Sequence, residues 1–88
     1  MSWTISYASS VERDIQRLPL SIRNEFTSVI EDLRRTPCLA GFKKLKGARD
    51  RYRIRIGHDY RLVYSVYKSE HLIDIEFIGH RKDAYRWF

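Results

Sequence analysis

The 88-residue chain has a single cysteine, Cys38, which rules out an internal disulfide framework and fits a reducing, cytoplasmic setting. One cysteine and three scattered histidines give no metal-ligand spacing, so we expect neither a metal nor any other cofactor. No apolar run approaches the length of about 18 residues that spans a membrane, and no membrane association is expected. The first ten residues, MSWTISYASS, lack the basic and apolar regions of a secretory signal.

The length allows one domain, residues 1–88, and 43% hydrophobic side chains can close one modest core. The net charge of +6 is unevenly distributed. Residues 1–42 hold five basic and five acidic side chains, whereas residues 43–88 hold 12 basic and 6 acidic ones. This asymmetry favours an anion-facing surface in the second half, with nucleic acid as the leading ligand and a merely solvated surface as the alternative.

Two amphipathic helices are predicted in the first half of the chain. Ser9 and Glu12 have the spacing of a capping box, and apolar residues continue at helical spacing until Pro19 ends the first helix. Ser21 is expected to cap a second helix, which stops before Pro37. The short connection predicts an antiparallel helix hairpin whose apolar stripes face the core.

The remaining pattern alternates as β-strands do. An N-terminal strand is predicted over residues 3–7, and three more over 52–56, 60–67 and 72–78, with a tight turn at Gly57–Asp59. The order is therefore β-α-α-β-β-β with a short C-terminal turn. It predicts an α+β fold of two layers, with the helix hairpin packed on one face of a mainly antiparallel sheet.

A three-residue turn at Gly57–Asp59 places Arg55 directly opposite Arg61, with Arg53 on the same face, away from the helices. Like charges in this position destabilise a sheet, unless an anion lies between them and uses the guanidinium groups. Weak surface pairs of the arginines with Asp74 and Glu76 are the alternative explanation.

A four-residue loop, Lys68–His71, is predicted between the last two strands. Extended without interruption, this register pairs Leu62 with Phe77 on the core face and leaves Ile78 on the arginine face.

Four segments in order carry a resemblance to a known family. They are KLKG from residue 44, YRIR from residue 52, DYRLVY from residue 59 and GHRKDAY from residue 79, preceded by the helical segment VERDIQRLPLSIRNEF. Together they resemble the RelE/ParE toxin superfamily over nearly the whole chain. The resemblance implies the toxin of a type II toxin–antitoxin system, with a cognate antitoxin protein as partner.

RelE-like members of that superfamily cut messenger RNA in the ribosomal A site without a metal. The 2′-hydroxyl attacks the adjacent phosphodiester, which requires a base, cationic stabilisation and an acid. Carried over by motif, the resemblance implies the catalytic residues Arg53, Arg55, Arg61, His80, Arg81 and Tyr85.

The strand positions Arg53 and Arg55 depart from the lysines that RelE-like toxins often carry. Arginine stays protonated and cannot serve as a base. His80, an imidazole beside Arg81, is the expected substitute. His58 lies in a turn, where we expect it to be solvated.

Lys43, Lys44, Lys46, Arg49 and Arg51 are expected to contact the backbone of ribosomal RNA beside the messenger. Two alternatives remain. One is a ParE-like toxin that inhibits DNA gyrase by binding and cuts nothing, since the fold would be the same. The other is a nucleic-acid-binding module without toxicity, which only the basic surface supports.

Overall fold

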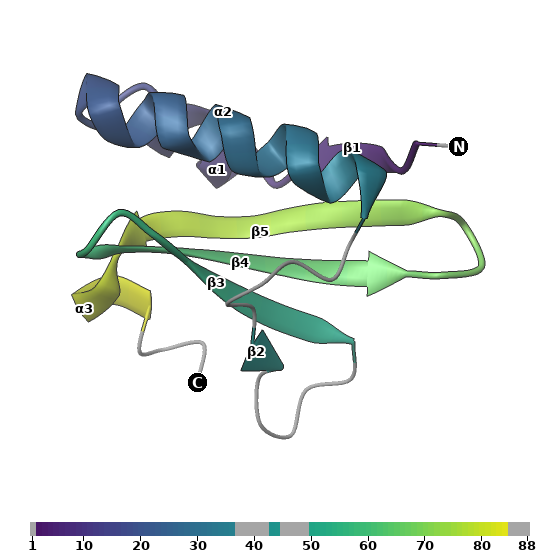
Figure 1. Cartoon of the computed structure of the whole chain (residues 1–88). Coiled ribbons are helices and arrows are strands. Elements are labelled where there is room, and N and C mark those ends of the chain that lie inside the picture. Colours follow the sequence, from purple (N-terminus) through teal and green to yellow (C-terminus); the bar gives the residue numbers. More distant parts are fainter. Residues whose placement is uncertain (1, 37–42, 45–49, 85–88) are drawn as a thin grey trace.

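The computed structural model describes residues 2–36, 43–44 and 50–84, which form two layers. Helices α1 (Ser9–Ile15) and α2 (Leu20–Arg35) lie on one face of a five-stranded sheet, and the short helix α3 (Arg81–Ala84) lies on the other (Figure 1). The predicted α+β class and helix layer are confirmed.

The sheet has the strand order β1-β5-β4-β3-β2. Its members are β1 (Thr4–Tyr7), β2 (Lys43–Lys44), β3 (Arg51–Ile56), β4 (Tyr60–Tyr67) and β5 (Leu72–His80). β1 pairs with β5 in parallel and the other pairs are antiparallel. The predicted strands are present, and β2 is an additional short edge strand that the sequence pattern did not indicate.

Both helices begin earlier than their predicted caps. Ala8 is the N-cap of α1. Its N–H donates to the carbonyl oxygen of Ile75 in β5, so the chain passes directly from the sheet into the helix. Pro19 is the N-cap of α2, and its carbonyl accepts the N–H of Arg23. Neither helix has a side-chain cap, so the predicted capping roles of Ser9 and Ser21 are wrong.

The turn between β3 and β4 confirms the predicted register. Ile56 pairs with Tyr60, and Arg55 pairs with Arg61. Gly57 has a φ of 61°, a conformation that favours glycine.

The register between β4 and β5 is as predicted only over its first part. Tyr67 pairs with Leu72 and Tyr64 with Ile75, but a β-bulge then shifts the pairing, so that Val63 faces Phe77 and Leu62 faces Ile78. The predicted pairing of Leu62 with Phe77 is therefore wrong. The extra residue of the bulge turns Phe77 to the arginine face and Ile78 to the face that the helices cover.

The bulge gives the sheet an apolar cluster on each face. The main core lies between the helices and the sheet and includes Ile78, which is 1% exposed. A small second cluster on the arginine face consists of Val63, Phe77 and Ala84 of α3. This cluster seats α3 beneath the sheet, beside the turn between β3 and β4 (Figure 1).

Candidate active site

Three strands bring Arg55, Arg61 and Gly79 into one row across the sheet. Arg61 is only 9% exposed, and its Nη1 donates to the carbonyl oxygens of His58 at 3.2 Å and Tyr60 at 2.9 Å. Arg55 is exposed, and no described residue forms a hydrogen bond or ion pair with its side chain. The row thus contains one fixed guanidinium and one directed to solvent.

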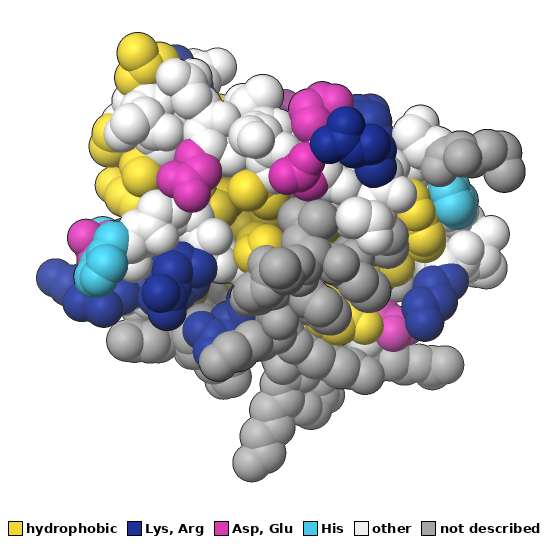
Figure 2. Space-filling model, viewed as in Figure 1, with side chains coloured by type: hydrophobic (Ala, Val, Ile, Leu, Met, Phe, Trp, Pro, Cys, Tyr) yellow, Lys and Arg dark blue, Asp and Glu magenta, His cyan; other side chains and the backbone are white. Residues whose placement is uncertain are grey.

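Arg81 joins this end of the sheet through Asp59. The N–H of Arg81 donates to the backbone oxygen of Asp59 at 2.7 Å, and its Nε lies 3.8 Å from the Asp59 carboxylate. Figure 2 shows basic side chains gathered with a histidine around this end of the molecule. The sheet and α3 therefore bring Arg55, Arg61 and Arg81 to one region.

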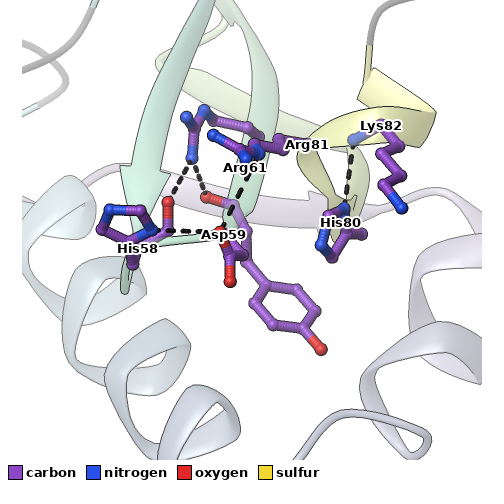
Figure 3. A network of polar contacts seen from close by, with 7 residues as sticks. His58, Asp59, Arg61, His80, Arg81 and Lys82 are labelled. Atoms are coloured by element: carbon purple, nitrogen blue, oxygen red, sulfur yellow. Dashed lines mark hydrogen bonds and ion pairs between the residues drawn. The ribbon is translucent and has the colours of Figure 1, made fainter.

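The Asp59 carboxylate also contacts the ring of His58. Its Oδ1 lies 3.0 Å from His58 Nδ1, so the carboxylate lies between that ring and Arg81 (Figure 3). The hydrogen bond from His58, aided by the positive charge of Arg81, holds the pKa of the Asp59 carboxyl below its usual value. Asp59 is therefore ionised at neutral pH.

His80 ends β5 and its ring contacts Tyr60 edge-on, with centroids 5.7 Å apart. Its Nδ1 accepts the backbone N–H of Lys82 at 3.2 Å (Figure 3). A neutral ring bound in this way carries its proton on Nε2, so neither nitrogen has a free lone pair. This hydrogen bond argues against the predicted role of His80 as a base and makes it a donor.

A cleft of about 230 Å³ lies beside this ring, between the end of α1 and the sheet. Tyr60, Gly79 and His80 line its sheet side, and Asp14 of α1 and Arg17, just after that helix, line the other.

The carboxylates of β5 lie farther along the sheet. Glu76 binds Arg51 through two hydrogen bonds, of 2.9 and 3.3 Å, and accepts the Ser65 hydroxyl at 2.5 Å. Asp74 accepts the hydroxyl of Ser6 at 2.9 Å. Glu76 thus neutralises Arg51, which was predicted to bind RNA.

Arg53 lies on the arginine face, opposite Val63 of β4 and Lys43 of β2. Tyr85, Lys46 and Arg49 lie outside the described residues, as do the side chains of Lys43 and Lys44. Within the described part of the chain, no group of three metal-ligating side chains occurs and no helix is long and apolar enough to cross a membrane.

Residues 5–85 match the family of the ParE toxin of type II toxin-antitoxin systems, parDE. The chain belongs to this toxin family. The resemblance that the sequence motifs carry to the RelE/ParE superfamily is confirmed.

Named relatives indicate a RelE-like toxin within the superfamily. A protein of Methanocaldococcus jannaschii described as a candidate toxin, RelE1, is 33% identical over 89 residues, which cover 98% of each chain. The toxin is also similar to the archaeal RelE–RelB complex of Pyrococcus horikoshii OT3, with 29% identity, a TM-score of 0.81 and coverage of 92% and 97% of the two chains. The RelB–RelE complex of Methanococcus jannaschii gives 29% identity, a TM-score of 0.77 and coverage of 94% and 98%.

Sequence reasoning missed the pair formed by His58 and Asp59 in the toxin. The two residues are adjacent in the turn between β3 and β4, which was predicted correctly. The family motif DYRLVY begins at Asp59 and therefore does not include His58. A histidine next to an aspartate between two arginine-bearing strands is the signal that could have indicated them.

Proposed function

We propose that the toxin is a metal-independent endoribonuclease that cuts messenger RNA in the ribosomal A site and so inhibits translation in the cytoplasm. The observation that carries this proposal is the facing pair of Arg55 and Arg61, with Arg81 at the same end of the sheet. Three guanidinium groups around one region suit a phosphodiester whose negative charge grows during the reaction.

The reaction is an attack of the 2′-oxygen on the adjacent phosphorus. It forms a 2′,3′-cyclic phosphate and releases a 5′-hydroxyl. In this proposal Arg55 and Arg81 bind the non-bridging oxygens, because both are exposed enough to reach a ligand. Arg61 stays bound to the turn and supplies positive charge beneath them. Arg53 extends this positive surface along β3.

His80 acts in the proposal through Nε2–H as a neutral donor to the phosphoryl group, since Nδ1 is engaged by Lys82. Tyr85 follows α3 in the sequence and stays in the proposal as a residue that the family motif implies, either to stack on a base or to donate a proton.

The ribosome and an antitoxin are the proposed partners. Lys43, Lys44, Lys46 and Arg49 would bind phosphates of ribosomal RNA, with the strong salt dependence of such contacts. Arg51 is a weaker candidate because Glu76 already binds its guanidinium. The similar archaeal RelE structures are complexes with RelB, which supports a cognate antitoxin that covers the cationic region.

The second candidate is a toxin that binds DNA gyrase, as the match to the ParE family suggests. Such a protein has no need of facing arginines near a donor histidine, so we give it second place. The two candidates share a fold and must be separated by activity.

The test adds purified toxin to a reconstituted translation reaction and maps the 5′ ends of the messenger. Cuts in frame that require translating ribosomes are expected. Arg81→Ala should reduce cleavage about a hundredfold, the size typical of a lost electrostatic contact to a transition state. Lys82→Ala removes an equal charge one residue away and should cut normally, because the backbone N–H bound to His80 remains. Intact messenger with gyrase-linked DNA breaks would instead establish the second candidate.

A further inference from the structure

The proposed endoribonuclease still lacks a base for the 2′-hydroxyl, and the inference that follows rests on that proposed function. Arg53, Arg55 and Arg61 stay protonated at any pH the protein tolerates. His80 has one nitrogen bound to Lys82 N–H and its proton on the other. Among the residues that the structure describes, the candidate for a base is therefore another side chain at this end of the sheet.

His58 has the complementary tautomer. Its Nδ1 is 3.0 Å from the Asp59 carboxylate, which accepts only, so Nδ1 carries the proton. The neutral ring then has its lone pair on Nε2. The side chain is 85% exposed, so this nitrogen can meet a ligand. A carboxylate that holds one imidazole nitrogen while the other takes a proton is the arrangement found in many general bases.

His58 lies at the same end of the sheet as Arg61 and Arg81. Its carbonyl oxygen accepts Arg61 Nη1, and the carboxylate that holds its ring lies 3.8 Å from Arg81 Nε (Figure 3). The turn between Arg55 and Arg61 therefore carries the imidazole and also holds the Arg61 guanidinium. A phosphodiester bound by the arginines would therefore lie beside this turn.

We infer that His58, oriented by Asp59, is the general base of the reaction. Nε2 takes the proton of the 2′-hydroxyl while the 2′-oxygen forms its bond to phosphorus. The bond between phosphorus and the 5′-oxygen breaks, and that oxygen takes a proton from solvent water. His58 later returns its proton to solvent. Asp59 stabilises the positive ring in between, without itself being protonated.

Charged and titratable groups from several elements surround this dyad. Arg61 belongs to β4 and Arg81 to α3, and His80 of β5 also acts on the Asp59 carboxylate. From α2, Glu25 Oε2 comes within 3.6 Å of the position that a Cβ on Gly57 would occupy. Cleavage should thus require a neutral His58 and an ionised Asp59.

The experiment measures single-turnover cleavage of messenger on programmed ribosomes between about pH 5.5 and 8.5, the range in which an imidazole titrates. The wild-type rate should rise with pH, as general-base catalysis by a neutral imidazole requires. His58→Asn should lower the rate about a hundredfold and remove this rise. Asp59→Asn should lower the rate less and alter the pH profile. His71→Asn, in the turn at the opposite end of the sheet, is the matched control and should retain both rate and profile, since asparagine tolerates its φ of 56°.

Two failures are distinguishable. If the wild type cuts and His58→Asn cuts equally fast with the same pH profile, the base is misassigned and the endoribonuclease proposal stands. If the wild type cuts nothing, the proposed function fails, and the catalytic role of His58 fails with it. Nitrogen-15 shifts of the rings give a readout independent of activity: a neutral His58 protonated on Nε2 would overturn the dyad.

Discussion

Arg55 and Arg61 lie directly opposite each other on β3 and β4, yet their surroundings differ. Arg61 is buried against the turn and donates to two carbonyl oxygens, whereas Arg55 is exposed to solvent. One arginine thus contributes to the structure of the turn, and both contribute positive charge.

Substitution of the two arginines should separate stability from charge. Arg61→Ala removes hydrogen bonds from a charged donor and should lower the free energy of unfolding by about 1–2 kcal/mol. Arg55→Ala should change it by less than about 0.5 kcal/mol, with a small gain at low salt as the repulsion disappears. Urea unfolding at low and high salt measures both. Equal losses of stability for the two variants would contradict the distinct roles.

Gly79 should be intolerant of a side chain because of Phe77. A Cβ at Gly79 would lie 2.8 Å from Cζ of the Phe77 ring, which is buried against Val63 and Ala84. Gly79→Ala should therefore destabilise the protein by about 1–3 kcal/mol, as overpacking does. In the double variant with Phe77→Leu the loss should be smaller than the sum of the single losses, which a double-mutant cycle by urea unfolding would detect. Strict additivity would show that the ring is not the obstacle.

The Asp59 carboxyl should titrate below the usual value for aspartate, about 3.9. Its pKa is lowered in the folded protein by the His58 hydrogen bond first, and by nearby positive charge. A lowered folded-state pKa contributes stability that is present above the unfolded pKa and is lost as pH falls through the folded one. The carbon-13 chemical shift of the Asp59 carboxyl, followed as a function of pH, gives the midpoint of its titration directly. This midpoint should rise toward the usual value in His58→Asn. An unchanged midpoint in that variant would remove the evidence for the hydrogen bond.

The Arg51–Glu76 pair should matter more than the helix ion pairs. The Glu76 side chain is only 16% exposed and binds both Arg51 and Ser65. Glu76→Gln should lower the free energy of unfolding by about 1 kcal/mol, since the hydrogen bonds from Arg51 and Ser65 lose their charged acceptor. The matched control is Glu31→Gln, whose pair with Arg34 is 3.8 Å long and 61% exposed on the glutamate side, and which should change stability by close to zero. Thermal unfolding of the two variants compares them.

The strands and the first hairpin of the fold could be predicted because each side chain has a clear polarity. Arg53, Ile54 and Arg55 alternate strictly, so only one register keeps the arginines out of the core. The bulge in β5 could not be predicted in this way, because Phe77 and Ile78 are both apolar and either can face the helices. The N-caps of α1 and α2 were missed because Ala8 and Pro19 have no side-chain oxygen that signals the start of a helix.

The candidate site was predictable in its charges and not in its hydrogen bonds. Positions of Arg55, Arg61 and Arg81 follow from register and motif. The tautomers of His58 and His80 depend on single contacts, to Asp59 and to Lys82 N–H, that no spacing rule specifies. The tautomers of these two histidines therefore follow from the hydrogen bonds of the fold, not from the sequence.

The parallel pairing of β1 with β5 has a consequence for biosynthesis. β5 lies between the first strand of the chain and β4, so the sheet cannot close until residues 72–80 have left the exit tunnel. Contacts this distant in sequence slow the folding of a nascent chain. A translating ribosome would thus carry this domain without its complete sheet until β5 has emerged.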